Sequence, residues 1–289
     1  MFFEQLINGL ILGCMYALLA ISFSLVLGIL GMLNLAQGEV LMAGAFVAYA
    51  ATTAGFGFFP ALFAAMAAGG LLSLIIEFFC FRLPKSDDPS TPVVTTIAMS
   101  LILQNFYTEI WGSEPLKFPE FGLRVRYEIF GISLNAVQIL LIAGSLFLMA
   151  ALSFVIAKTW TGREIRTVAQ SKTAARVVGI DIPLTIVKTF LLSGLIAGIA
   201  GVMAGLVFSH ITPFVGSKVG NKAMVAMVIG GAGSMKGAMI SGVLLGIVEI
   251  LSVAYLGVEY REIIVFLLLI LFLWFRPEGL FKLGKVERI

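Results

Sequence analysis

The sequence has 289 residues, of which 60% are hydrophobic and 12% are charged. Soluble proteins are about half apolar and about one quarter charged, so this composition excludes an ordinary soluble domain and predicts an integral membrane protein. The formal net charge of +3 is too small to indicate a nucleic-acid partner.

Nine apolar segments follow one another along the chain. A helix needs roughly 20 apolar residues to cross about 30 Å of hydrocarbon, so the sequence predicts one all-α domain over residues 1–289, a polytopic membrane protein with eight or nine transmembrane helices. No Lys or Arg precedes Arg82, so the first segment lacks the basic start of a cleaved signal peptide and is expected to stay in the protein. The predicted segments are Leu6–Leu30, Val40–Thr53, Pro60–Phe81, Pro92–Ile110, Ser133–Ala157, Thr189–Ser209, Ala223–Ala232, Ala238–Tyr255 and Ile263–Phe275.

Two of these segments are shorter than a full span. Ala223–Ala232 runs into the Gly-rich stretch GGAGSMKG, which predicts a broken or re-entrant helix whose free backbone groups face protein or a wet cavity. Ile263–Phe275 is expected to begin before Arg261, with Arg261 and Glu262 reaching to the membrane interface. Closely spaced glycines predict tight helix packing; they are Gly194, Gly198, Gly201, Gly205, Gly242 and Gly246.

Basic residues are unevenly divided between two sets of loops. The loops at 82–91, 158–188 and 233–237 and the tail from 276 hold 13 of the 19 Lys and Arg residues. Cytoplasmic loops carry an excess of Lys and Arg, so this set is predicted to be cytoplasmic. The N-terminus would then lie outside and the C-terminus inside. The outer set comprises the N-terminus and the loops at 55–59, 111–132, 210–222 and 256–262.

The stretch GMLNLAQGEVLMAGAF places Asn34, Gln37 and Glu39 between two apolar segments. A buried polar group without a partner costs a few kcal/mol, and a charge at the bilayer centre costs about 2.5 kcal/mol or more. Two interpretations follow. These residues either form a turn at the lipid headgroups, or they line a break beside an inner cavity that a solute passes.

A second polar set lies in TTIAMSLILQNFYTE. Thr96, Ser100 and Gln104 recur at helical spacing, and Asn105 lies about 100° around the helix from Gln104. Such a set predicts either hydrogen bonds between helices or a solute path.

The remaining carboxylate, thiol and imidazole groups stand singly in the sequence. Glu77 is expected to reach the headgroups, and the deeper Glu249 to be neutralised by a helical partner or by protonation. Cys14 and Cys80 are predicted as core residues and the single His210 as a surface residue. The sequence contains no phosphate-binding loop, no metal-ligand spacing and no nucleophile–base set, so we expect no catalytic residue, no metal and no cofactor, and the chain is not expected to be an enzyme.

A basic loop at residues 158–183 joins the fifth and sixth segments. Its composition from Gly162 to Val178 predicts a short amphipathic helix that Gly179 ends. Such a helix either anchors on anionic lipid or docks a cytoplasmic partner. The apolar face is expected to comprise Ile165, Val168, Ala169 and Ala175.

Within that loop, GREIRTVAQSKTAARVVGID resembles the coupling-loop motif of ABC importer permeases of the branched-chain amino acid type, with Thr167 where Ala is usual. Three further stretches are similar to that family. They are GCMYALLAISFSLVLGILGMLNLAQGEVLMAGAF, where Gln37 replaces a frequent His, GGAGSMKGAMISGVLL, and RPEGLF at Arg276–Phe281. The resemblance covers essentially the whole chain and suggests the shorter of the two partner permeases.

The resemblance implies a permease subunit of an ATP-driven importer in the inner (plasma) membrane. It would form half of the path for a branched-chain or related amino acid, beside a second permease. Two cytoplasmic ATPase subunits and an external solute-binding protein would be its partners, in a lipid surrounding. The implied path residues are Asn34, Gln37, Gly38, Glu39, Thr96, Ser100, Gln104 and Asn105. The implied coupling residues are Gly162, Arg163, Glu164, Arg166, Gln170, Ala174, Ala175, Arg176 and Gly179.

Two other functions stay open at this point. Permeases with similar motifs carry urea and short amides. A self-sufficient secondary transporter could instead use Glu39, Glu77 or Glu249 as an ion or proton site.

Overall fold

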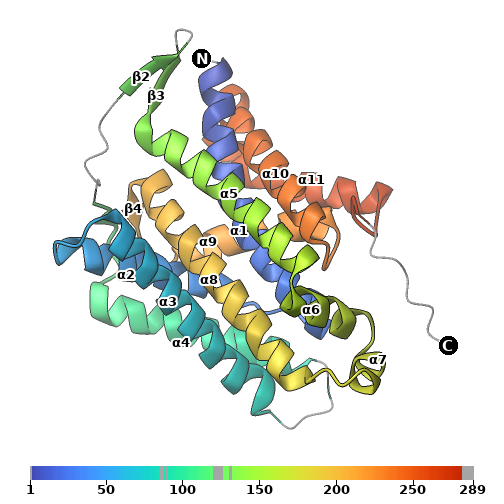
Figure 1. The fold of residues 1–289 in the computed structure, drawn as a ribbon. Helices are drawn as coiled ribbons and strands as arrows, with labels where there is room; N and C mark the ends of the chain where they lie inside the picture. The colour runs from blue at the N-terminus through green and yellow to red at the C-terminus, as the bar shows by residue number, and fades with distance from the viewer. Residues whose placement is uncertain (1, 85–87, 89, 120–125, 130–131, 282–289) are drawn as a thin grey trace.

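A computed structural model describes residues 2–84, 88, 90–119, 126–129 and 132–281. The described chain is a helical bundle with two small antiparallel strand pairs (Figure 1). Apolar runs of this length become helices because a helix satisfies every internal backbone group where no water is present. The helices are α1 (Phe2–Leu30), α2 (Gln37–Thr53), α3 (Phe58–Ile76) continued by the π-helical turn η1 (Glu77–Arg82), α4 (Thr91–Trp111), α5 (Ala136–Lys158), α6 (Trp160–Gln170), α7 (Lys172–Val177), α8 (Ile182–Phe208), α9 (Val215–Gly230), α10 (Met235–Leu256), the 3-10 turn η2 (Val258–Tyr260) and α11 (Arg261–Phe275). The strands are β1 (Leu116–Lys117), β2 (Arg126–Ile129), β3 (Ile132–Asn135) and β4 (His210–Ile211).

Each of the nine predicted segments corresponds to a helix, which confirms the all-α membrane fold. Five helices are long and apolar enough to cross a membrane by themselves: α1, α3 with η1, α5, α8 and α10. The other four are α2, α4, α9 and α11, of which α2, α9 and α11 have only 17, 16 and 15 residues. At 1.5 Å per residue these three are about 22–26 Å long.

Some predicted boundaries were wrong. α5 begins at Ala136, because Ser133 to Asn135 belong to strand β3. α8 begins at Ile182, well before the predicted Thr189, since Asp181 caps its first turn by accepting a hydrogen bond from the backbone N–H of Leu184 at 3.1 Å. α11 begins at Arg261 and not before it.

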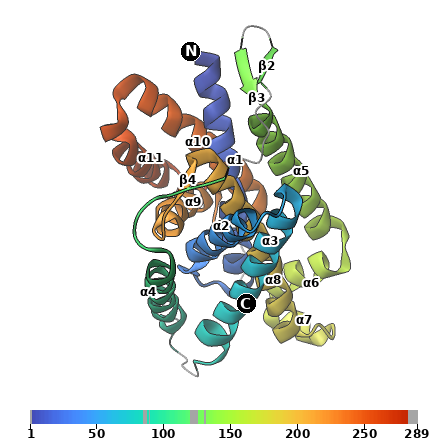
Figure 2. The ribbon, with the colours of Figure 1, turned by 90° about the vertical axis from the view of Figure 1, so that its left-hand side faces the viewer.

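Helix α1 runs through the middle of the bundle, with α5, α8 and α10 beside it (Figures 1 and 2). In its most apolar stretch 89% of the residues are buried, against 22% in α5, so α1 is the core helix and α5 is peripheral. Glycines permit the close approach, as predicted. A Cβ on Gly198 of α8 would overlap the backbone of Ala65 in α3, and one on Gly246 of α10 would overlap the backbone of Gly13 in α1.

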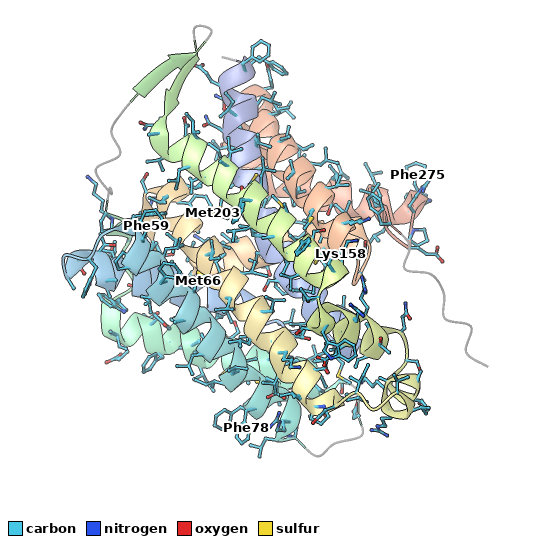
Figure 3. The ribbon with its side chains drawn as sticks, in the orientation of Figure 1. Phe59, Met66, Phe78, Lys158, Met203 and Phe275 are labelled. Atoms are coloured by element: carbon cyan, nitrogen blue, oxygen red, sulfur yellow. The ribbon has the colours of Figure 1, made fainter. Side chains whose placement is uncertain are left out.

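The bundle has two distinct ends. At one end β1 pairs with β4, β2 pairs with β3, and Gln138 at the start of α5 donates to Asn8 in α1 at 3.1 Å. At the other end lie α6 and α7 (Figure 1). Phe59 and Phe78, labelled in Figure 3, are exposed side chains at opposite ends of the rod formed by α3 and η1. The start of α3 and the strands therefore lie at one end of the bundle, and η1, α6 and α7 lie at the other.

The loop-charge prediction needs one correction. Lys188, Lys218 and Lys222 were counted as loop residues but lie inside α8 and α9, because these helices begin earlier than hydropathy indicated. The basic residues Lys85, Arg124, Lys282, Lys285 and Arg288 were also counted and lie outside the described residues. The orientation of the termini stays a prediction.

Candidate functional site: a mid-depth pocket and an exposed helical surface

A small pocket lies at half the depth of the bundle, where Ser100 marks the centre of α4. Its volume is about 170 Å³. Of the lining residues Ile97, Leu101 and Asn221 are exposed, so the pocket opens on the side of the chain formed by α4 and α9. The lining comprises Phe23, Leu35, Gly38, Glu39, Ile97, Ser100, Leu101, Gly216, Ser217, Gly220, Asn221 and Met224.

Glu39 is the charged group of this pocket. One of its carboxylate oxygens, Oε1, accepts hydrogen bonds from Ser100 Oγ at 3.0 Å and from Gln104 Nε2 at 2.7 Å. The other, Oε2, is buried and has no hydrogen-bond partner among the described residues. The carboxylate is therefore held by neutral donors from α4, which leave half of its accepting capacity unused.

Two helix starts meet beside this carboxylate. Glu39 lies in the first turn of α2, and a Cβ on Gly216 in the first turn of α9 would lie 2.8 Å from Oε2. Gly38 and Gly216 touch backbone to backbone, so a side chain on either one would prevent the approach. The first turn of a helix presents free N–H groups and the positive end of the helix dipole, which stabilise a buried anion without an ion pair.

Asn34 and Gln37 lie away from this pocket, in a buried hydrogen-bond network. Gln37 Nε2 donates to Ser22 Oγ at 2.5 Å and to Ser193 Oγ at 3.0 Å, and Asn34 Nδ2 donates to Gln37 Oε1 at 2.9 Å. Asn34 Oδ1 accepts from the backbone N–H of Ala36 at 3.2 Å. Neither residue lines the pocket. Their polar groups satisfy one another, tie α2 to α1 and α8, and fix the chain reversal before α2.

The remaining predicted path residues are divided. Thr96 is buried and its hydroxyl accepts from the backbone N–H of Leu35 at 3.3 Å, so it too stabilises the reversal before α2. Asn105 is exposed and donates to the carbonyl of Leu101 at 2.8 Å. Only Gly38, Glu39 and Ser100 of the predicted set line the pocket directly, and Gln104 supports Glu39.

Sequence analysis missed the residues that α9 contributes to the pocket. Gly216, Ser217, Gly220 and Asn221 lie within VGSKVGNK, which was assigned to a loop because its polar residues lower the local hydropathy, and Met224 lies in the predicted segment Ala223–Ala232. The spacing of Gly216 and Gly220, one helical turn apart and on one face, was the available signal for a helix.

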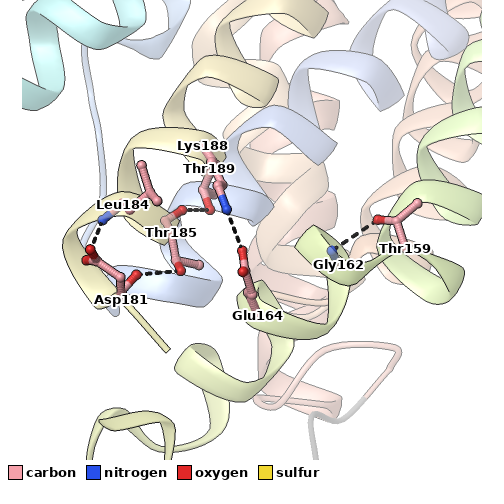
Figure 4. Close-up of polar contacts among 8 residues, drawn as sticks. All are labelled: Thr159, Gly162, Glu164, Asp181, Leu184, Thr185, Lys188 and Thr189. Atoms are coloured by element: carbon pink, nitrogen blue, oxygen red, sulfur yellow. Dashed lines mark hydrogen bonds and ion pairs between the residues drawn. The ribbon is translucent and has the colours of Figure 1, made fainter. Parts of the chain in front are cut away.

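The predicted coupling helix proved to be two helices. α6 and α7 are separated at Ser171, whose backbone is extended and whose hydroxyl accepts from the backbone N–H of Ala174 at 3.2 Å. Thr159 caps α6 in the same way by accepting from Gly162 N–H at 3.2 Å (Figure 4). Gly179, with φ +81°, ends the segment as predicted.

The inner face of α6 is packed against the bundle. Gly162, Ile165 and Val168 are buried, and a Cβ on Gly162 would overlap the carbonyl oxygen of Ile156. Glu164 binds Lys188 of α8 at 2.8 Å and so anchors α6 (Figure 4). Ala169, in the last turn of α6, was expected on this face but is exposed.

The outer face of α6 and α7 is a continuous exposed surface, called here the α6–α7 surface. Val177 is 84% exposed and Val178 is 74% exposed, so apolar side chains lie among basic ones without any cover from the described chain. Ala175 is buried, whereas the other predicted coupling residues outside the inner face are exposed. The exposed ones are Arg163, Arg166, Gln170, Ala174, Arg176 and Gly179.

Two further motifs form one structural unit. The GGAGSMKG stretch is the turn between α9 and α10, and the segment after α11 binds it. Backbone N–H groups of Leu280 and Phe281 donate to the carbonyls of Ile229 at 2.9 Å and Gly230 at 3.1 Å. The RPEGLF sequence thus acts as a clasp at the C-terminal end of α9.

The buried acids Glu77 and Glu249, unlike Glu39, have charged partners. Arg82 reaches back to Glu77 at 3.3 Å, so Glu77 stays buried instead of extending to the headgroups. Glu249 contacts both Lys222 and Arg261, which confirms a helical partner. Arg261 and Glu262 were expected at the interface. Arg261 instead turns inward to Glu249, whereas Glu262 stays exposed while it pairs with Lys222.

No group of three or more potential metal ligands is present in the described part of the chain. Cys14 and Cys80 are free and buried, as expected of core residues. His210 is exposed in β4, as predicted.

Comparison with known proteins gives the family. The family described as "Branched-chain amino acid transport system / permease component" matches residues 5–273. The chain is similar to the high-affinity branched-chain amino acid transport system permease protein LivH of Escherichia coli K12, at 35% identity over all of this chain and 98% of that protein. LivH of Salmonella typhimurium is 34% identical over the same shares, and BraD of Pseudomonas aeruginosa is 32% identical over 100% and 98%. The chain therefore belongs to the permease family of branched-chain amino acid transport systems.

Proposed function

We propose that this chain is one permease subunit of an ATP-driven importer for branched-chain or related amino acids in the inner membrane. The observation that carries the proposal is the α6–α7 surface. A pair of short capped helices is fixed to α8 by the Glu164–Lys188 ion pair, yet exposes valines and arginines. An exposed apolar patch rimmed by charge is typical of a protein interface. Two cytoplasmic ATPase subunits are the proposed partners, one on this subunit and one on its companion.

The mid-depth pocket is proposed as part of the solute path. It is open on the side formed by α4 and α9, so a second, similar permease is needed there to enclose a solute. Apolar residues such as Phe23, Leu101 and Met224 suit a branched aliphatic side chain, and the Glu39 carboxylate suits an α-ammonium group. Asn34, Gln37 and Thr96 support the path by fixing the start of α2.

ATP binding is proposed to move the path by way of α6. A ligand shifts a conformational equilibrium only through its different affinity for the two states, so the ATPases must grip the α6–α7 surface differently in the inward- and outward-facing states. An external binding protein would deliver the amino acid to the end that carries β1 to β4. The ATPase chemistry would belong to the partner subunits.

The test is charge insertion on the α6–α7 surface in the purified transporter. Ala174 is exposed, so Ala174→Glu should leave folding intact, and Arg166→Glu reverses an exposed charge. Both variants should lower amino-acid-stimulated ATP hydrolysis about tenfold and reduce co-purification of the ATPases. Lys117→Glu, an exposed charge reversal at the other end, should leave co-purification unchanged. Normal coupling in both α6–α7 variants would refute the docking role, and uptake by the isolated chain in liposomes would refute the need for partners.

A further inference from the structure

Four charged side chains meet where α9, α10 and α11 pack together. Lys222 Nζ of α9 lies 2.8 Å from Glu249 Oε1 of α10 and 2.8 Å from Glu262 Oε1 of α11. Arg261 Nε of α11 contacts the same oxygen of Glu249. The Lys222 and Glu249 side chains are 7% and 0% exposed. Two cations and two anions balance, which is the condition under which buried charges are tolerated.

The other side of α9 faces the pocket. Asn221 and Met224, next to Lys222 in the sequence, line it. Successive residues of a helix point about 100° apart, so Lys222 can reach α10 and α11 while Asn221 and Met224 point to the pocket. One short helix therefore carries the charge cluster on one face and the pocket wall on the other.

On its pocket side, α9 packs against α2 through glycines. Gly216 and Gly220 of α9 meet Gly38 of α2 backbone on backbone. On the opposite side α9 is held at two points. The charge cluster holds Lys222, near the middle of the helix, and the clasp at Leu280 and Phe281 holds its C-terminal end.

We propose that Lys222 is a positioning residue for the solute path. Its ion pairs with Glu249 and Glu262 set where α9 lies against α2 and α4, and so set the width of the pocket at Asn221. This inference rests on the proposed function of the pocket as part of the path. Directional contacts of a buried ammonium suit this role, because sliding of α9 by even a short distance would separate charges in a medium of low dielectric.

The chain offers a variant that removes only the α9 connection. Lys222→Met leaves the Glu249–Arg261 pair neutral by itself, and Glu262, whose side chain is 61% exposed, remains in contact with water. This variant is therefore expected to fold. Lys222→Arg keeps the charge. Lys218→Met removes an exposed lysine one turn earlier on the same helix and serves as the matched control.

The experiment measures the pocket directly as well as transport. In the full transporter in membrane vesicles, with the buried Cys14 and Cys80 changed to Ala, the thiol introduced by Asn221→Cys is labelled with a small water-soluble thiol reagent. Lys222→Met should change the labelling rate about fivefold or more and lower leucine uptake at saturating binding protein about tenfold. Lys222→Arg and Lys218→Met should stay close to the parent. A thiol introduced by Glu114→Cys, at an exposed position in the loop after α4, should label equally in all variants.

Parental labelling and uptake in Lys222→Met would overturn the proposal, as would loss of stability with an unchanged labelling rate. If Lys222→Met does not fold, Lys222→Met/Glu262→Gln also removes the anion that has lost its partner, keeps the Glu249–Arg261 pair and decides the same question. Failure of the proposed function is distinguishable, because a parent transporter that takes up no leucine leaves the labelling comparison intact.

Discussion

Replacing Gln37 by Met tests whether this buried amide is a structural support or part of the solute path. The side chain makes three hydrogen bonds, to Ser22, Ser193 and Asn34. Met has a similar volume, so packing changes should cost less than about 1.5 kcal/mol. The two serines remain satisfied, since their hydroxyls also bond to each other at 2.9 Å and to each other's carbonyls.

The substitution leaves one donor without a partner, namely the Asn34 amide N–H, which donates to Gln37 Oε1 in the parent protein. A buried donor without a partner costs about 1–3 kcal/mol. We therefore expect the free energy of unfolding to fall by about 2–3 kcal/mol and the apparent melting temperature by roughly 5 °C. Uptake per folded molecule should stay within about twofold, because Gln37 does not line the pocket.

The assay is thermal or steric-trap unfolding in detergent, paired with uptake in vesicles. Asn34→Ala and the double variant Asn34→Ala/Gln37→Met complete a double-mutant cycle. The double variant has no unpaired donor, so its loss of unfolding free energy should be smaller than the sum of the two single losses by about 1 kcal/mol or more. Unchanged stability together with a large loss of uptake would refute the structural role and place Gln37 on the path.

Three further predictions concern single contacts. Glu39→Gln keeps an acceptor for Ser100 but removes the charge, so melting should change by only a few degrees while uptake falls about tenfold; equal uptake would exclude a role for the carboxylate. Gly162→Val places side-chain atoms on the Ile156 carbonyl, so it should lower the free energy of unfolding by about 1–3 kcal/mol and release ATPase subunits. The control Gly144→Ala, in open space on α5, should leave the free energy of unfolding unchanged or raise it. Glu164→Gln breaks a partly exposed ion pair and should lower the free energy of unfolding by about 1 kcal/mol or less. Unfolding is measured at low and at high salt, and a loss that does not depend on salt would contradict an ionic origin.

Local pattern was enough to predict the class of this protein and most of its helices. A long apolar run has no alternative to a helix in hydrocarbon, so composition alone implied the all-α membrane fold and nine helical segments. Small residues at close spacing likewise predicted packing that the contact of Gly198 with α3 confirms. The capped segment after α5 was recognisable for the same reason, because Gly179 and the amphipathic spacing act over a few residues.

The tertiary structure alone decided which polar groups meet. Gln37 bonds to Ser22 and Ser193, which are 15 and 156 residues away, and no periodicity encodes such a pairing. Lys222 was assigned to a loop because polar residues lower hydropathy, whereas in the fold its charge is balanced by Glu249 from another helix. A hydropathy scale treats each side chain as if it stood by itself in lipid. A partner from a distant segment removes the free-energy cost of burying a polar or charged group. Which polar residue supports the fold and which one faces the pocket therefore depends on how the helices pack.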